Sequence, residues 1–299
     1  MFIPTKVQFN LTYDIVFKEV FSDVKIASNL INVILNESFP SSDFKVMANE
    51  LSSESIELKN SLFDVRLNVL NKYDIDLEMQ KNKPYKYSLI DRIIFYNAKM
   101  IAKSIEEGDS TYKGKTCISV VFINFELKGY NKCVNTIYYT DEEGRDVSKH
   151  KIYLIDLTKS DLCDNLKLKK WLELIKSEEL NSFEGEDEVM SEVVKKVFTV
   201  NADERLRAKL LSQEKFMRDR QIELAAVKED ARAEGLQEGR AKGLQEGRVQ
   251  GIAQGIAQGR EEGKVEGILE VARNMKAKNM PIDQIVELTS LSVDEINKL

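Results

Sequence analysis

The stretch LFDVRLNVLNKYDIDLEMQ, residues 62–80, decides the fold, because it alternates strictly between apolar and polar side chains. Apolar residues occupy the odd positions 63–69 and 73–79, and polar residues occupy the even positions 64–68 and 74–80. A period of two is typical of β-strands, in which successive side chains point to opposite faces of the sheet. The stretch therefore predicts two neighbouring strands, each with one apolar face and one polar face.

The polar face of this hairpin is the first candidate site. Two adjacent strands share a buried face only when paired residues have the same parity, and a three-residue loop of residues 70–72 satisfies that condition. The hairpin then puts Arg66 opposite Asp76, so that the two charges neutralise each other. It also puts Asp64 opposite Glu78. Like charges that face each other directly, with Cβ atoms about 4.5–5.5 Å apart, destabilise a sheet.

A divalent cation between Asp64 and Glu78 would remove this repulsion, because Mg²⁺ prefers carboxylate oxygens. Gln80, two residues further on, would project beside the same site. A loop centred one residue later, at residues 71–73, would instead pair Glu78 with Arg66 and leave an ordinary solvated strand face. The spacing alone leaves both interpretations open.

The composition limits the class of protein. The chain has 299 residues, of which 42% are hydrophobic and 31% charged, and no run of 18 apolar residues that could span a membrane. The N-terminus lacks a basic segment followed by an apolar one, and three cysteines without metal-ligand spacing indicate reduced thiols, so we expect a cytoplasmic protein. A net charge of −6 argues against a broadly basic surface for nucleic acid, but 44 Lys and Arg residues leave room for a local basic groove.

The flanking segments predict helices and further strands. Residues 12–36 have helical spacing, and Ser22 and Asp23 could cap a second segment, which would divide the stretch into two helices. Residues 86–107 predict a helix that ends at Gly108, while residues 44–51, 117–127, 135–140 and 151–157 predict strands, of which 117–127 is apolar enough for a central one. We therefore expect an α/β (α+β-like) fold, with a mixed sheet flanked by helices and Trp171 in its core. We assign no chemistry to His150.

Asp64, thirteen intervening residues and then Glu78-x-Gln80 resemble the D…(D/E)-x-K signature of the PD-(D/E)XK nuclease superfamily, with Gln in place of Lys. With this variant, the chain resembles the Rpn family of recombination-promoting nucleases and transposases. The likeness also rests on YDIVFKEVF (13–21), DRIIFYNAKMIAKSIEEGDSTY (91–112), ADERLRAKLLSQEKFMRD (202–219) and the glycine-rich repeat that follows.

The resemblance implies a restriction-endonuclease-like core in which Asp64 and Glu78 ligate Mg²⁺ or Mn²⁺. The metal would stabilise charge on the phosphate and lower the pKa of the attacking water. Gln80 would stand at the position of the usual lysine, where it can orient a water but carries no charge. Lys81 or Lys83 could supply that charge instead, and both also suit a solvated turn.

Three further residues match the family's motifs. Asp14 and Lys18 lie four residues apart on the first predicted helix, either as support for the metal or phosphate or as an exposed ion pair. Arg92 lies on the helix after the hairpin, where the resemblance suggests contact with phosphate or a structural role.

The function that follows is a metal-dependent DNA endonuclease, linked to recombination, transposition or defence. The alternative is a catalytically weak or inactive DNA-binding or assembly protein that keeps the nuclease fold as a scaffold. A third interpretation is a structural oligomer whose acidic hairpin is only solvated.

Glycine recurs at every fourth position from 235 to 267, nine times in all. In a helix, nine interior glycines would cost roughly 7–9 kcal/mol relative to alanine, which close approach of a partner helix could offset. We therefore expect a homodimer or larger oligomer through residues 235–267, with a flexible linker as the alternative. The 14 acidic and 13 basic residues within 201–270 favour helix pairing over an electrostatic tail.

The predicted domains are a nuclease-like domain at 1–200, a helical arm at 201–275 and a helix-turn-helix-like cap at 276–299. Pro281 suits the first turn of a helix, and Ser292 with Glu295 predicts a capping box at the start of a second. The second helix is too short and too poor in basic residues to read a DNA groove convincingly, so a hydrophobic or oligomer-forming role is favoured.

Overall fold

The computed structural model of the chain describes residues 6–48, 50–51, 61–62, 64–70, 72–84, 88–105, 114–185 and 187–299. Its strands are β1 (Phe44–Val46), β2 (Glu50–Leu51), β3 (Ser61–Leu62), β4 (Val65–Val69), β5 (Tyr73–Gln80), β6 (Thr116–Ile123), β7 (Val134–Thr140) and β8 (Asp146–Asp156). Its helices are α1 (Asp14–Phe21), α2 (Val24–Leu35), α3 (Leu89–Ser104), α4 (Leu166–Lys176), α5 (Glu188–Ala202), α6 (Glu204–Ala277), α7 (Ile282–Thr289) and α8 (Val293–Lys298).

A six-stranded mixed sheet forms the centre of the first part of the chain, with strand order β1-β4-β5-β6-β8-β7. The outer pairings β1–β4, β4–β5 and β7–β8 are antiparallel, whereas β5–β6 and β6–β8 are parallel. The predicted fold class, a mixed sheet flanked by helices, is confirmed. The predicted strand at 117–127 is β6, which lies inside the sheet and is buried along nearly its whole length.

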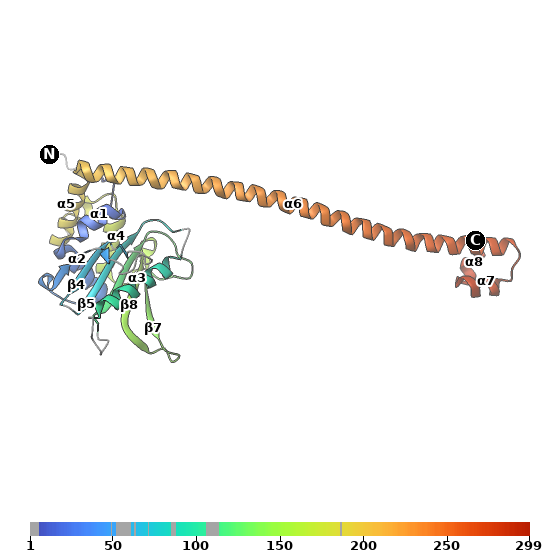
Figure 1. Cartoon of the computed structure of the whole chain (residues 1–299), viewed down its shortest axis with the longest axis horizontal. Coiled ribbons are helices and arrows are strands. Elements are labelled where there is room, and N and C mark those ends of the chain that lie inside the picture. Colours follow the sequence, from blue (N-terminus) through green and yellow to red (C-terminus); the bar gives the residue numbers. More distant parts are fainter. Residues whose placement is uncertain are drawn as a thin grey trace. The chain divides into compact units, whose positions relative to one another are not determined.

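Helices cover both faces of this sheet (Figure 1). The odd-numbered side chains of β4 and β5 belong to the main hydrophobic core, which α1, α2, α4 and α5 complete and which contains Trp171, as expected. Leu89 and Ile93 of α3 pack on the opposite face, against Val121 and Leu154 of β6 and β8. Three even-numbered residues of β5 on the same face as α3, Asp74, Asp76 and Glu78, are buried rather than solvated.

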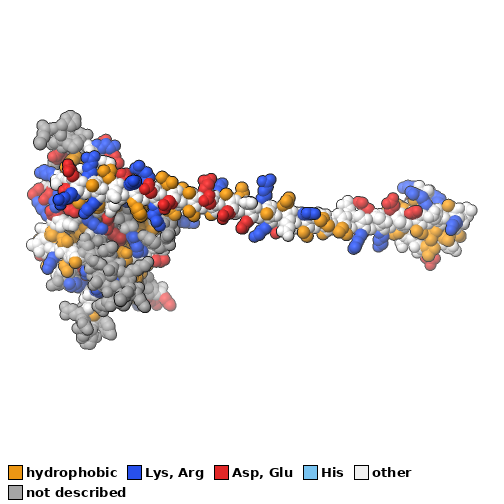
Figure 2. Space-filling view, turned by 45° about the horizontal axis from the view of Figure 1, so that its top comes forward, with side chains coloured by type: hydrophobic (Ala, Val, Ile, Leu, Met, Phe, Trp, Pro, Cys, Tyr) orange, Lys and Arg blue, Asp and Glu red, His pale blue; other side chains and the backbone are white. Residues whose placement is uncertain are grey.

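The chain divides into two compact units, Met1–Phe216 and Met217–Leu299, with the boundary inside α6. The glycine repeat lies in α6, and each of its glycines has open space where a Cβ atom would project. Figure 2 shows hydrophobic, basic and acidic side chains intermingled along α6. Among the described residues, no helix combines the length and the apolar character needed to cross a membrane.

The C-terminal helices α7 and α8 pack against the end of α6 through buried Ala272, Ile285 and Ile296. Lys276 Nζ donates to the carbonyl oxygen of Ile296 at 2.9 Å. The predicted capping box is confirmed, because the Ser292 side chain accepts from the Glu295 N–H while the Glu295 side chain accepts from the Ser292 N–H. The three-domain division predicted from the sequence stays a prediction.

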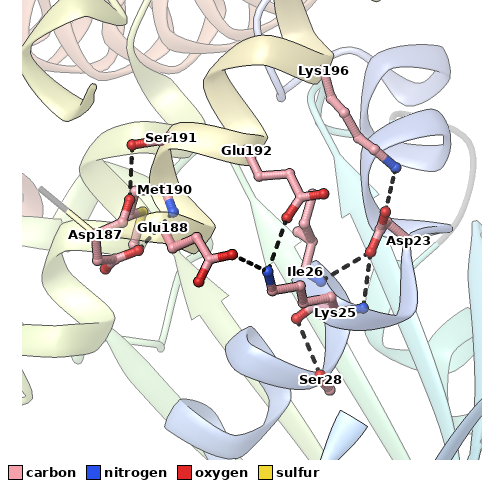
Figure 3. A network of polar contacts seen from close by, with 10 residues as sticks. All are labelled: Asp23, Lys25, Ile26, Ser28, Asp187, Glu188, Met190, Ser191, Glu192 and Lys196. Carbon is pink, nitrogen blue, oxygen red and sulfur yellow. Dashed lines mark hydrogen bonds and ion pairs between the residues drawn. The ribbon is translucent and has the colours of Figure 1, made fainter. Parts of the chain in front are cut away.

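A capping residue separates α1 from α2, as the sequence suggested. The Asp23 carboxylate accepts hydrogen bonds from the N–H groups of Lys25 and Ile26 and forms a 2.6 Å ion pair with Lys196 of α5 (Figure 3). Lys25 in turn forms an ion pair with Glu188 of α5, at 2.7 Å. An N-cap is worth about 0.5–2 kcal/mol, so Asp23 both begins α2 and holds it against α5.

Candidate active site

The observed hairpin register decides between the two loops considered above. Val65 pairs with Leu77, and Arg66 pairs with Asp76, so the loop is residues 70–72. The register with a loop at 71–73, which would have paired Glu78 with Arg66, is excluded. Asp64 comes directly before β4, and Glu78 lies near the end of β5. Because the two strands are antiparallel, both acids lie at the same end of the strand pair.

Asp64 is held by the end of β5 and by α1. Its Oδ2 accepts a hydrogen bond from the Met79 N–H at 2.8 Å, and its Oδ1 lies 3.2 Å from Lys18 Nζ. Lys18 Nζ also lies 3.1 Å from Asp14 Oδ1. The structure therefore brings Asp14 and Lys18 to the candidate metal ligand, and their ion pair is not merely a feature of the helix surface.

Burial is the main cause that raises the pKa of Asp64 to about 8. The negative charges of Asp14 and Glu78 raise it further, against the opposing effects of Lys18 and of the Met79 N–H. Burial by itself lowers the pKa of Lys18, but the two aspartates more than offset this and raise it. The positive charge of Lys18 therefore does not fully compensate the negative charges of the buried carboxylates around it.

Glu78 lies on the face covered by α3, and its exposed fraction is 4%. Its Oε1 accepts from Arg92 Nη2 at 2.9 Å and from Gln80 Nε2 at 3.0 Å. Burial raises the pKa of Glu78, although Arg92 and Lys18 lower it. Arg92 therefore contacts a candidate metal ligand directly, and the amide of Gln80 is directed at the same carboxylate.

One sequence-based expectation about this face is wrong. Arg66 lies opposite Asp76 in the register, but its ion pair is with Asp74, not with Asp76. The guanidinium reaches diagonally along the sheet, and neither carboxylate oxygen of Asp76 has a hydrogen-bond partner among the described residues. Burial raises the pKa of Asp76 well above its ordinary value, with Glu78 and Asp64 acting in the same direction.

Lys81 does not supply the charge that Gln80 lacks. Its Nζ lies 3.0 Å from the centroid of the Tyr13 ring, a cation–π contact. Burial lowers the pKa of Lys81 to about 8, despite the opposing effects of Glu214 and Glu178. The structure thus directs this lysine to an aromatic ring. Lys83 is exposed.

The two acids offer a suitable donor set for a hard divalent cation. Glu78 Oε2 is buried and has no hydrogen-bond partner among the described residues, and the raised pKa values of Asp64 and Glu78 reflect negative charge that a cation would neutralise. Carboxylate oxygens are the ligands that Mg²⁺ and Mn²⁺ prefer. Within the described ranges, no group of three or more His, Cys, Asp and Glu residues could hold a metal ion.

Sequence reasoning missed a polar group beside this site. Ser119 of β6 pairs with Asp76 in the register, and Asn97 of α3 donates to Ser119 Oγ at 3.0 Å. All three residues are at most 1% exposed. A signal was present, because Ser119 interrupts the otherwise apolar segment CISVVFI, but only the docking of α3 shows which polar residue meets it.

A mixed sheet between helical layers, with acidic residues from two adjacent strands at one edge and a Glu-x-Gln sequence on the second, defines a nuclease-like protein of the PD-(D/E)XK type. Residues 11–227 of the 299 match the PD-(D/E)XK nuclease family transposases, and the chain belongs to this family. PD-(D/E)XK nucleases generally use divalent metal ions, and a nuclease family implies DNA as the substrate. No curated protein and no solved structure matches the chain.

Proposed function

We propose that this protein is a metal-dependent DNA endonuclease that hydrolyses phosphodiester bonds. The observation that carries the proposal is the pair of buried acids, Asp64 and Glu78, which come from adjacent strand ends and have raised pKa values. They would hold Mg²⁺ or Mn²⁺, which when bound supplies charge stabilisation for the phosphate and lowers the pKa of a water. A role in recombination, transposition or defence extends this proposal.

The other residues of the cluster have separate proposed roles. Arg92 orients Glu78 through its 2.9 Å ion pair and keeps a positive charge beside it. Gln80 donates to the same carboxylate and offers no charge of its own. Lys18, at 3.2 Å from Asp64, supplies the positive charge that the lysine of the motif usually supplies.

The experiment that tests the function is cleavage of supercoiled plasmid by the full chain with Mg²⁺ or Mn²⁺, against the same reaction in EDTA. Nicking that needs the metal supports the endonuclease. A folded protein that binds DNA but cleaves with neither metal would favour the second candidate function, a DNA-binding or assembly protein. The observation that favours this second candidate is the neutral side chain of Gln80 at the position of the motif's lysine.

The Lys18→Met variant is expected to cleave about 10–100-fold more slowly, because a hydrogen bond to a charged group is worth roughly 1.5–3 kcal/mol. Adding Gln80→Lys to this variant is expected to restore part of the rate, since it returns a cation to the site. Plasmid cleavage under single-turnover conditions measures both effects. Lys45→Met, at an exposed lysine of β1, is the matched control, and a Lys18→Met rate equal to that of this control would contradict the role of Lys18.

We also propose that α6 pairs with α6 of a second copy of the chain through its glycines. Leu236, Leu244, Ile252 and Ile256 each directly follow a glycine and are 53–78% exposed. The repeat therefore combines a row of glycines, open to close approach, with large apolar side chains beside it. Acidic and basic residues are nearly balanced along the helix, so two copies would not repel each other strongly.

The Gly247→Ala, Gly251→Ala double variant separates pairing from a lone helix. Alanine raises helix propensity by about 0.8–1 kcal/mol per site, so an unpaired helix would become more stable. In a close-packed pair the added methyl groups hold the helices apart, and we expect weaker self-association in sedimentation equilibrium. The control is Gln237→Ala, Gln245→Ala, two positions beyond a glycine and thus on the far side of the helix. Unchanged or tighter association of the glycine variant would contradict the pairing.

A further inference from the structure

A groove of 1460 Å³ lies at the opposite end of the central strands from the acidic cluster. Its walls come from the amino ends of β5 and β6, from β8 and from the segment after α2. Small-molecule pockets usually measure roughly 300–1,000 Å³. The groove is larger than that, and much of its lining is exposed or half-buried, so its dimensions suit a polymer better than a small ligand.

The lining of the groove is basic, although the chain as a whole is acidic. Among the described residues, four lysines line it, Lys72, Lys115, Lys149 and Lys151, against two acidic residues, Glu37 and Asp146. Asp146 forms a 3.5 Å ion pair with Lys151. In the part of the chain that the structure describes, the other three lysines make no ion pair. Three lysines without an ion pair among the described residues therefore converge on one groove.

Aromatic and neutral polar groups lie between these lysines. Tyr73 and Tyr153 are half-buried in the lining, and Lys72 Nζ lies 4.9 Å from the centroid of the Tyr73 ring. His150 Nδ1 accepts a hydrogen bond from the Cys117 N–H at 3.0 Å, and burial lowers the pKa of His150, so its imidazole is neutral at pH 7. Both tyrosine rings pack against the main core, so this lining offers phosphate contacts from its lysines rather than base stacking.

The groove is separate from the acidic cluster but close enough to serve the same substrate. Tyr73 and Glu78 lie on the same strand, five residues apart, which corresponds to about 17 Å. Successive phosphates of one DNA strand are spaced about 3.4 Å apart along the duplex axis. Because β5 is buried on both faces, a DNA follows a longer path over the surface, and one that reaches both sites extends over more than five nucleotides.

We infer that this groove binds the phosphodiester backbone of DNA at a distance from the point of cleavage. The identity of the polymer rests on the proposed endonuclease function, whereas the anion-binding chemistry follows from the lysines themselves. The groove contributes affinity without base recognition, because lysines at phosphates position a nucleic acid but carry no sequence information. It also explains how a chain with a net charge of −6 holds a polyanion.

The test is binding of a fluorescently labelled 30-base-pair duplex to the full chain in EDTA, measured by anisotropy over a range of salt concentrations. The variant carries Lys72→Ala, Lys115→Ala and Lys149→Ala. We expect its affinity at low salt to fall at least about tenfold, and the slope of log K against log salt to become shallower by about two units, since each lost phosphate contact changes it by roughly 0.7–0.9.

The matched control removes three exposed lysines elsewhere, Lys45, Lys167 and Lys195, and so changes the net charge by the same amount. Its affinity is expected to stay within about twofold of that of the original chain. Equal losses in the two triple variants, or no loss in the groove variant, would overturn the inference. Fluorescence of Trp171, the only tryptophan, verifies that each variant is folded.

Cleavage assays on the same proteins keep this inference distinct from the proposed function. If the original chain cleaves DNA but the groove variant binds DNA equally well, the inference about the groove is wrong and the proposed endonuclease function is supported. If the original chain does not cleave DNA with Mg²⁺ or Mn²⁺ but the groove variant loses affinity for the duplex, the inference about the groove is supported and the proposed endonuclease function is wrong. Competition of duplex binding by inorganic phosphate at constant ionic strength would point to a site for free anions and would overturn the DNA assignment.

Discussion

Replacing Glu78 by glutamine is expected to slow metal-dependent plasmid cleavage by about 10²–10³-fold. A bound metal supplies several kcal/mol of charge stabilisation, and each 1.36 kcal/mol corresponds to tenfold in rate. Glutamine has nearly the same shape as glutamate, and its Oε1 can still accept from Arg92 Nη2. The substitution therefore removes the negative charge while it leaves the packing under α3 largely intact.

Two controls make this result specific. Glu142→Gln, at an exposed glutamate in the turn between β7 and β8, removes the same charge outside the acidic cluster and is expected to cleave normally. Isothermal titration with Mn²⁺ measures metal affinity without any reaction, and the Glu78→Gln variant is expected to bind at least about tenfold more weakly. Cleavage by Glu78→Gln at the rate of the Glu142→Gln control would remove Glu78 from the site.

The Asp76→Asn variant is expected to be more stable than the original chain at pH 7, by about 1–3 kcal/mol. At pH 7 the Asp76 carboxyl is ionised in the unfolded chain, whereas burial favours its protonated form in the folded protein, and this difference lowers the stability of the folded state. Neither oxygen of Asp76 has a hydrogen-bond partner among the described residues, and the side chain is 1% exposed. Asparagine keeps the size of the side chain and cannot ionise, so the variant avoids burying a charge.

The same carboxyl group predicts how stability depends on pH. Because burial raises the pKa of Asp76 in the folded protein, the folded state retains a proton that the unfolded chain releases above about pH 4. The free energy of unfolding therefore falls as the pH rises from about 4 towards the folded pKa, by at most about 1.36 kcal/mol per pH unit for each such group. Asp64, with its pKa near 8, and Glu78 act in the same direction.

Urea unfolding in EDTA between pH 5 and 8, followed by the fluorescence of buried Trp171, measures this dependence. The Asp76→Asn variant is expected to show a shallower fall in stability with pH than the original chain. The exposed Asp161→Asn is the matched control and is expected to follow the original curve. A less stable Asp76→Asn variant at pH 7 would mean that the Asp76 carboxylate has a stabilising partner in the folded protein.

Features that depend on neighbouring residues could be predicted from the sequence alone. The parity of residues 62–80 predicted the hairpin and excluded registers that exchange its buried and polar faces, but only the structure decided between the loops at 70–72 and 71–73. Asp23 and the Ser292–Glu295 pair were recognised as caps because an N-cap side chain bonds to backbone groups only two or three residues away. An uninterrupted apolar segment likewise indicated that β6 lies inside the sheet.

Features that depend on distant side chains could not be predicted in this way. Arg66 bonds Asp74 rather than Asp76, because a long guanidinium side chain reaches beyond the residue opposite it. Asp76 is buried on the face of the sheet that α3 covers, and α3 packs there against β6 and β8 through contacts that no local pattern encodes. The proposed lysine groove joins segments more than 70 residues apart, and only the parallel pairing of β5, β6 and β8 brings their amino ends together.

The hairpin, the order of its acids and the family of the chain could thus be recognised from the amino-acid sequence. Their parity and spacing are properties of a single short segment. The position of Lys18, 3.2 Å from Asp64, and the contact of Arg92 with Glu78 depend instead on how the helices pack on the sheet. The physical reason is that a side chain's electrostatic environment depends on which helices pack over its strand, and that packing is settled by the whole core rather than by the strand's own residues.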